Sequence, residues 1–155
     1  MSLRARIRDA VERGELGEIE GLVAGDPRAV RHLLGLTYHP ADPVRQVACR
    51  GVALAGKHHR RLVQNLVRRL VWAMNDESGT NALTAPPVIL AIANEAPELL
   101  LPMVADLVRL ASDEGLHAGL AAALRIVSDR CPGRVGEEMQ KALNQRWQGG
   151  ESDVA

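Results

Sequence analysis

Residues 42–52 read D-P-V-R-Q-V-A-C-R-G-V, and this stretch decides the fold class. Asp42 followed by Pro43 is typical of a helix start, because Asp caps the first turn and Pro is tolerated at the first helical position. Apolar residues then recur at intervals of three and four, at Val44, Val47, Ala48, Gly51, Val52 and Ala55. That spacing places them on one face of an α-helix. The stretch therefore predicts an amphipathic helix that buries this face.

The same spacing recurs in other parts of the chain. It predicts long helices over residues 58–74, 100–111 and 116–127, and shorter ones around 3–11, 16–23, 30–38, 88–96 and 135–147. The chain is 46% hydrophobic but has no Phe, one Tyr and two Trp, so its core must consist of Leu, Val, Ala and Ile. The alternation of Val, Ile and Thr that marks strands is missing. We therefore predict an all-α protein.

Helix pairs also repeat along the sequence. A-N-E-A-P at 93–97 aligns with S-D-R-C-P at 128–132, and residues 44–52 align with 116–124, at offsets of 35 and 72. Repeats of this length built from helix pairs are typical of α-solenoids. We predict a right-handed α-solenoid (superhelix) of antiparallel helix pairs. It forms one domain at 1–148, with N-terminal helices at 1–40 and repeats at 42–147, followed by a flexible tail at 149–155.

The stretch at 42–52 resembles the first helix of a HEAT-like (armadillo-type) repeat. In that pattern Asp caps the helix, Val and Arg follow, and small apolar residues face the neighbouring repeat. The matching positions here are Asp42, Val44, Arg45, Ala48 and Val52. Residues 113–126 repeat the pattern with His117 in place of Arg, whereas the middle unit at 80–92 departs from it because Pro86 and Pro87 occupy its first turn. The resemblance covers roughly residues 42–147.

This resemblance implies a fold more than a function. HEAT-like modules scaffold other proteins, and relatives of the class act as bilin lyases or as DNA glycosylases. Residues 72–87, W-A-M-N-D-E-S-G-T-N-A-L-T-A-P-P, also resemble a segment of small HEAT-like proteins of bacteria and archaea. The resemblance implies a protein-binding module, and its alternative is a ligand-binding or lyase/glycosylase-type site that uses Trp72, Asp76 and Glu77.

Trp72 lies on the polar side of the helix predicted over 58–74. The apolar stripe of that helix comprises Leu62, Val63, Leu66, Val67, Leu70, Val71 and Met74. At about 100° per residue Trp72 falls roughly opposite this stripe, and Arg68, one turn earlier, is placed to stack on its ring. Either the N-A-L-T loop or the N-terminal helices cover Trp72, or it is exposed and anchors a protein partner on a concave surface. In the second case the partner face comprises Arg61, Asn65, Arg68, Arg69, Trp72, Asn75, Asp76 and Glu77.

The polar run at 75–81 follows that helix. Its acid, amide and hydroxyl groups offer ligands for a cation or a general base, although EF-hand spacing is absent. Alternatively Gly79 ends the helix, and Asn81 or Thr84 starts the next one. We favour the structural turn, keep partner contact as an alternative, and predict neither a metal site nor a cofactor.

The charge distribution is uneven although the formal net charge is zero. Residues 1–75 hold 13 Lys and Arg against 7 Asp and Glu, and the remainder holds 6 against 12. This asymmetry indicates head-to-tail contact in a homo-oligomer or a partner attracted to one end, but an unevenly charged solvated surface explains it equally well. A basic ridge comprises Arg60, Arg61, Arg68 and Arg69. Nucleic-acid binding through the basic N-terminal half is a further alternative function, although zero net charge and few aromatic residues disfavour it.

Other patterns indicate a cytoplasmic protein without a recognised catalytic motif. The N-terminus is charged from Arg4 onwards, unlike a signal peptide, and no apolar run approaches the about 20 residues that span a bilayer. Cys49 and Cys131 fit small buried hydrophobes in a reducing compartment. His58 and His59 are adjacent on a helix, point about 100° apart and do not converge on one metal ion. We therefore predict a non-enzymatic interaction module without membrane contact.

Overall fold

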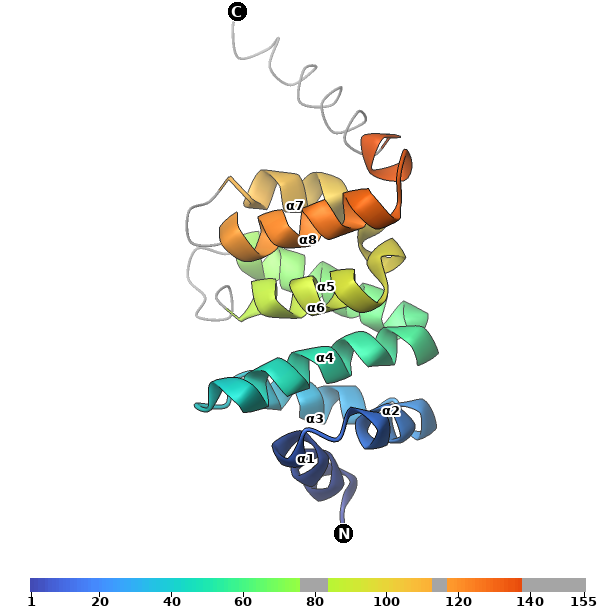
Figure 1. Ribbon diagram of the computed structural model, residues 1–155, viewed down its shortest axis with the longest axis vertical. Helices are drawn as coiled ribbons and strands as arrows, with labels where there is room; N and C mark the ends of the chain where they lie inside the picture. Colours follow the sequence, from blue (N-terminus) through green and yellow to red (C-terminus); the bar gives the residue numbers. More distant parts are fainter. Residues whose placement is uncertain (76–83, 113–116, 138–155) are drawn as a thin grey trace, which may run out of the picture.

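The computed structural model describes residues 1–75, 84–112 and 117–137 (Figure 1), and the regular elements within these ranges are all helical. They are α1 (Leu3–Arg13), α2 (Leu16–Gly25), α3 (Ala29–Leu36), α4 (Asp42–His58), α5 (Arg60–Asn75), α6 (Ala85–Glu95), the 3-10 helix η2 (Pro97–Met103), α7 (Val104–Leu110) and α8 (His117–Arg130). The prediction of an all-α protein is confirmed. The tail at 149–155 lies outside the described residues.

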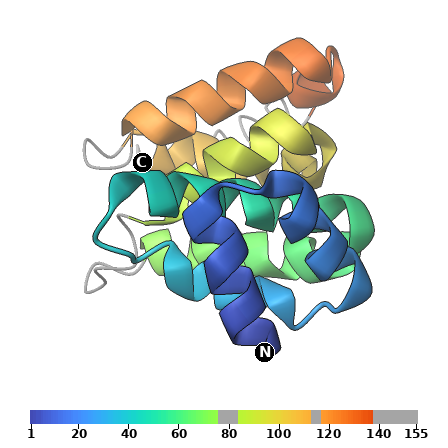
Figure 2. The same cartoon turned by 60° about the horizontal axis from the view of Figure 1, so that its bottom comes forward.

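The helices are stacked in chain order from one end of the molecule to the other. Along one side α2 packs on α4, α4 on α6, and α6 on α8. Figure 1 shows α3, α5 and α7 behind this row, where α3 and α5 pack against α4, and α7 packs against α8. At the N-terminal end, which comes forward in Figure 2, α1 packs against α2 and α3. The two rows meet in one apolar core.

Helix α4 is the central element of this core. Residues 51–56 are all buried, so its C-terminal half is covered on every side rather than on the single predicted face. Small residues allow the neighbouring helices to approach closely. A Cβ at Gly51 would lie 2.9 Å from Leu33 Cδ2 and 3.0 Å from Ile19 Cγ2. Because Leu33 and Ile19 belong to α3 and α2, Gly51 sets the distance of both helices from α4.

A second glycine has the same role between α6 and α8. A Cβ at Gly119 would lie 2.8 Å from Pro86 Cβ and 3.6 Å from the Pro86 carbonyl carbon. Pro86 belongs to the first turn of α6, where a proline costs no helical hydrogen bond. The two prolines that depart from the repeat pattern therefore start a helix, and one of them forms its contact with α8.

Two expected helix boundaries are wrong. The helix predicted over 100–111 is divided between η2 and α7, because Pro102 lies inside η2 and lacks the N–H that a continuous α-helix needs. Asp42 does not cap α4 but is its first residue, with Ala41 at the cap position. The Asp42 carboxylate accepts hydrogen bonds from Arg45 Nη2 (2.9 Å) and Gln46 Nε2 (2.7 Å).

The two adjacent histidines at the end of α4 connect it to α2. His59 Nε2 lies 2.6 Å from the Val23 carbonyl oxygen, which can only accept, so the imidazole donates this hydrogen bond. His58 Nε2 lies 3.1 Å from Glu20 Oε1. The two rings contact different groups on α2, so they do not converge on one point. Among the helices of the described ranges, none has the length and apolar composition that crossing a bilayer requires.

Candidate functional site

Trp72 stands on the outer surface of α5. Its side chain is 79% exposed, so the N-terminal helices do not cover it. The opposite face of α5 buries Val63, Leu66, Val67, Val71 and Met74. The helix phase predicted from the apolar spacing is therefore correct, and a large aromatic side chain lies in solvent where burial is the norm.

The other described residues of the predicted partner face lie on the same helix as Trp72. Arg61, Asn65, Arg68, Arg69 and Asn75 are all exposed on α5. The Arg68 guanidinium donates a hydrogen bond to Asn65 Oδ1 (3.1 Å), one turn toward the N-terminus of α5. Trp72 lies one turn from Arg68 in the opposite direction, toward the C-terminus of the helix. Asn75 Nδ2 donates to the Val71 carbonyl (3.1 Å) at the end of the helix. Asp76 and Glu77 lie outside the described residues.

A groove of about 520 Å³ separates α5 from α3. Its lining residues are Pro27, Arg28, Val30, Arg31, His32, Leu34, Leu62, Leu66 and Arg69. Leu62 is 39% exposed and lines this groove, so its predicted place in the core stripe is wrong. On a helical wheel it lies about 100° from Val63, at the edge of the buried face and toward α3. Arg69 is the residue of the predicted partner face that lines the groove.

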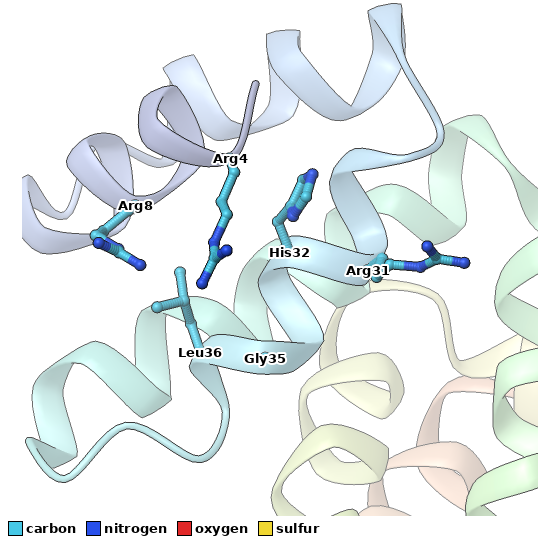
Figure 3. Close-up of a pocket in the computed structure, with 6 residues that line it drawn as sticks. All are labelled: Arg4, Arg8, Arg31, His32, Gly35 and Leu36. Atoms are coloured by element: carbon cyan, nitrogen blue, oxygen red, sulfur yellow. The ribbon is translucent and has the colours of Figure 1, made fainter. Parts of the chain in front are cut away.

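A second, smaller cleft of about 290 Å³ lies on the other side of α3, against α1. Its lining residues are Arg4, Arg8, Arg31, His32, Gly35 and Leu36. Figure 3 shows Arg4 and Arg8 extending from α1 toward α3, while His32 and Leu36 project from α3 and Arg31 points toward the other side of that helix. Arg31 and His32 line both spaces.

Positive charge dominates both the groove and the cleft. Neither lining contains an Asp or Glu side chain from the residues that the structure describes. Arg28 at the rim is neutralised by Asp26 (Nη2 to Oδ2, 2.7 Å). Hydrogen bonds from the Arg28 side chain and then from its backbone N–H lower the pKa of Asp26 to about 2. Arg4, Arg8, Arg31 and Arg69 form no ion pair with any carboxylate of the described ranges.

The α1/α3 cleft was not predicted from the sequence. Arg4 and Arg8 are four residues apart and therefore share one face of α1, and Arg31 and His32 give α3 a basic segment. Each basic segment is therefore visible in the sequence. Spacing within the sequence does not predict that α1 packs against α3, and this packing brings the two basic segments together.

The side chains that line the groove and the cleft are suited to binding a ligand or partner. Arginine forks, an imidazole and leucine side chains provide hydrogen-bond donors and apolar contact. Within the described ranges there is no group of three or more His, Cys, Asp or Glu that could hold a metal ion. Burial raises the pKa of the Cys49 thiol to about 11, so the thiol stays protonated and is a poor nucleophile.

Comparisons with known proteins identify no relative of this chain. No protein-family model matches the chain, and neither the curated proteins nor the solved structures contain a significant match.

Proposed function

We propose that this chain is a non-enzymatic interaction module whose α3–α5 groove binds an acidic, partly apolar segment of a protein partner. The observation that carries the proposal is the combination of an apolar wall and an unpaired basic rim. Leu34, Leu62 and Leu66 provide the wall, and Arg31 and Arg69 provide charge without an ion-pair partner among the described residues.

Energetic considerations support this use of the surface. Covering an exposed leucine contributes up to about 1.5–3 kcal/mol to binding, before the entropic cost of association. Trp and Arg are the residues that most often dominate binding energy at protein interfaces. Trp72 follows Arg69 by three residues, so the two neighbour each other on the helix surface. Unpaired arginines also attract an acidic segment and accelerate its association.

The proposal extends to the arrangement of the helices. We propose a right-handed α-solenoid of antiparallel helix pairs in the HEAT-like class. The stacking of α4, α6 and α8 in chain order, with α3, α5 and α7 on the other side, supports it. In such a solenoid the second helix of each pair lines the binding surface. Helix α5, which carries Trp72 and Leu62, would be one of these helices.

The test compares partner capture by three proteins in nuclease-treated extract from the native host. They are the wild type, a groove variant (Leu62→Asp with Arg69→Glu) and a control variant (Arg125→Glu). Arg125 is exposed on α8, away from the groove, so the control reverses one arginine without changing the proposed surface. Circular dichroism first establishes that all three are folded.

The captured protein is then produced, and its acidic segments are titrated against the three proteins. We expect micromolar or tighter binding that weakens with salt, is lost in the groove variant and is retained by Arg125→Glu. Equal binding by wild type and groove variant would exclude the groove as the docking surface. A second copy of this chain is the alternative occupant, and a concentration-dependent dimer that disappears in the groove variant would replace the proposal.

A further inference from the structure

The cleft between α1 and α3 gathers arginine side chains, and no acidic side chain of the described residues lines it. Arg4 and Arg8 approach it from α1, and His32 from α3, with Arg31 at its border (Figure 3). Like charges four residues apart on a helix, such as Arg4 and Arg8, repel each other. An arrangement of this kind becomes favourable when an anion occupies the space between the side chains.

Most carboxylates of the first three helices are engaged by other cations. Arg13 Nη2 lies 2.8 Å from both Asp9 Oδ2 and Glu18 Oε2. Glu20 Oε1 lies 3.1 Å from His58 Nε2. Asp26 is held by Arg28 at 2.7 Å. Glu15 lies 4.0 Å from Arg13 Nη1. Glu12, one turn after Arg8 on α1, forms no ion pair with a cation of the described ranges. The lining of the cleft contains no acidic side chain from the described residues.

We propose that this cleft binds the phosphate group of a small molecule. A phosphate carries up to two negative charges and several acceptor oxygens, so it accepts hydrogen bonds from more than one guanidinium fork at once. A carboxylate has two oxygens, which a single fork already occupies. The volume of about 290 Å³ lies near the lower limit of small-molecule sites, and Leu36 offers apolar contact to the rest of the ligand.

The shape of the site favours a small ligand over a nucleic-acid backbone. A duplex is bound by charges distributed along an extended surface, with a strong dependence on salt. Here the charges converge between two short helices. The site is also distinct from the proposed partner groove, since Arg4 and Arg8 belong to the cleft alone, whereas Leu62 and Arg69 belong to the groove alone. Arg31 and His32 line both and are left unchanged in either experiment.

The experiment measures the affinity of inorganic pyrophosphate by isothermal titration calorimetry at constant ionic strength. It compares the full-length wild type, the double variant Arg4→Gln with Arg8→Gln, and the control Arg6→Gln. Arg6 is exposed on α1 but points about 160° away from Arg4, so it removes a nearby charge without touching the cleft. All three positions are exposed, and circular dichroism checks that each variant is folded.

We expect saturable one-to-one binding to the wild type, at least tenfold weaker binding to the double variant, and a change of less than twofold for Arg6→Gln. No saturable binding to the wild type would overturn the proposal. Equal weakening in both variants would show general attraction of counterions and would overturn it as well. A short single-stranded oligonucleotide that binds more tightly than pyrophosphate, with steep salt dependence, would replace the small-molecule site with a nucleic-acid surface.

Discussion

Helices α4 and α5 are consecutive and nearly equal in length, with 17 and 16 residues, yet they have opposite relations to solvent. Residues 51–56 of α4 are Gly, Val, Ala and one Leu, and all of them are buried by neighbouring helices. Helix α5 buries one face and exposes arginines, Leu62 and Trp72 on the rest of its surface. The comparison shows that residue size, as well as apolar spacing, decides which of two amphipathic helices becomes the centre of the core.

The largest expected effect comes from placing the same charged residue in each helix. Val52→Asp puts a carboxylate into a fully buried site, and we expect a loss of more than about 3 kcal/mol in the free energy of unfolding. Trp72→Asp changes an exposed position and should cost less than about 1 kcal/mol. Urea denaturation followed by far-UV circular dichroism measures both. Similar losses would mean that Trp72 is covered in solution.

A second pair of variants tests the role of small residues in α4. Gly51→Ala adds a methyl group against the buried Leu33 and Ile19, and overpacking should cost about 1–3 kcal/mol. Gly21→Ala lies inside α2, where the new Cβ meets no atom within 4 Å, so it should stabilise the protein by up to about 1 kcal/mol. Thermal melting distinguishes the two signs. Stabilisation by Gly51→Ala would show that α2 and α3 pack more loosely on α4.

The junction between α4 and α5 offers a smaller effect. His59→Ala removes the hydrogen bond to the Val23 carbonyl, and we expect a loss of about 1 kcal/mol. His58→Ala removes only a partly exposed pair with Glu20 and should cost less than about 0.5 kcal/mol. Chemical denaturation at neutral pH compares the two variants. A larger loss of stability for His58→Ala than for His59→Ala would show that the pair with Glu20 contributes more than the hydrogen bond to Val23.

The smallest effect concerns the pH dependence of the groove rim. The pKa of Asp26 is lowered from 3.8 to about 2 in the folded protein, so its contribution to stability is present above pH 4 and is lost as pH falls toward 2. Asp26→Asn should therefore melt slightly below the wild type at pH 6, and the difference should shrink below pH 4 and disappear as pH falls through about 2. A difference in melting temperature that is constant between pH 6 and pH 2 would exclude the ion pair with Arg28 as its source.

Much of the fold follows from periodicity, since the apolar spacing correctly predicted most helices of the described ranges and the outward phase of Trp72. The helix predicted over 135–147 lies mostly outside those ranges. The errors arise where a local pattern meets tertiary packing. Pro102 interrupts an otherwise continuous apolar stripe, and Leu62 continues a stripe whose neighbours leave that edge open. The α1/α3 cleft depends on two segments more than 20 residues apart in sequence, so spacing within either helix does not predict it.

The exposed placement of the described aromatic side chains has a spectroscopic consequence. The aromatic side chains within the described ranges are Tyr38, which is 54% exposed, and Trp72, which is 79% exposed, so the described core contains neither Tyr nor Trp. Trp147, the other tryptophan, lies outside those ranges. Emission from Trp72 thus reports on the surface of α5 and on whatever covers it, while loss of the core changes the far-UV signal instead. The fluorescence of Trp72 is therefore a probe of docking before it is a probe of folding.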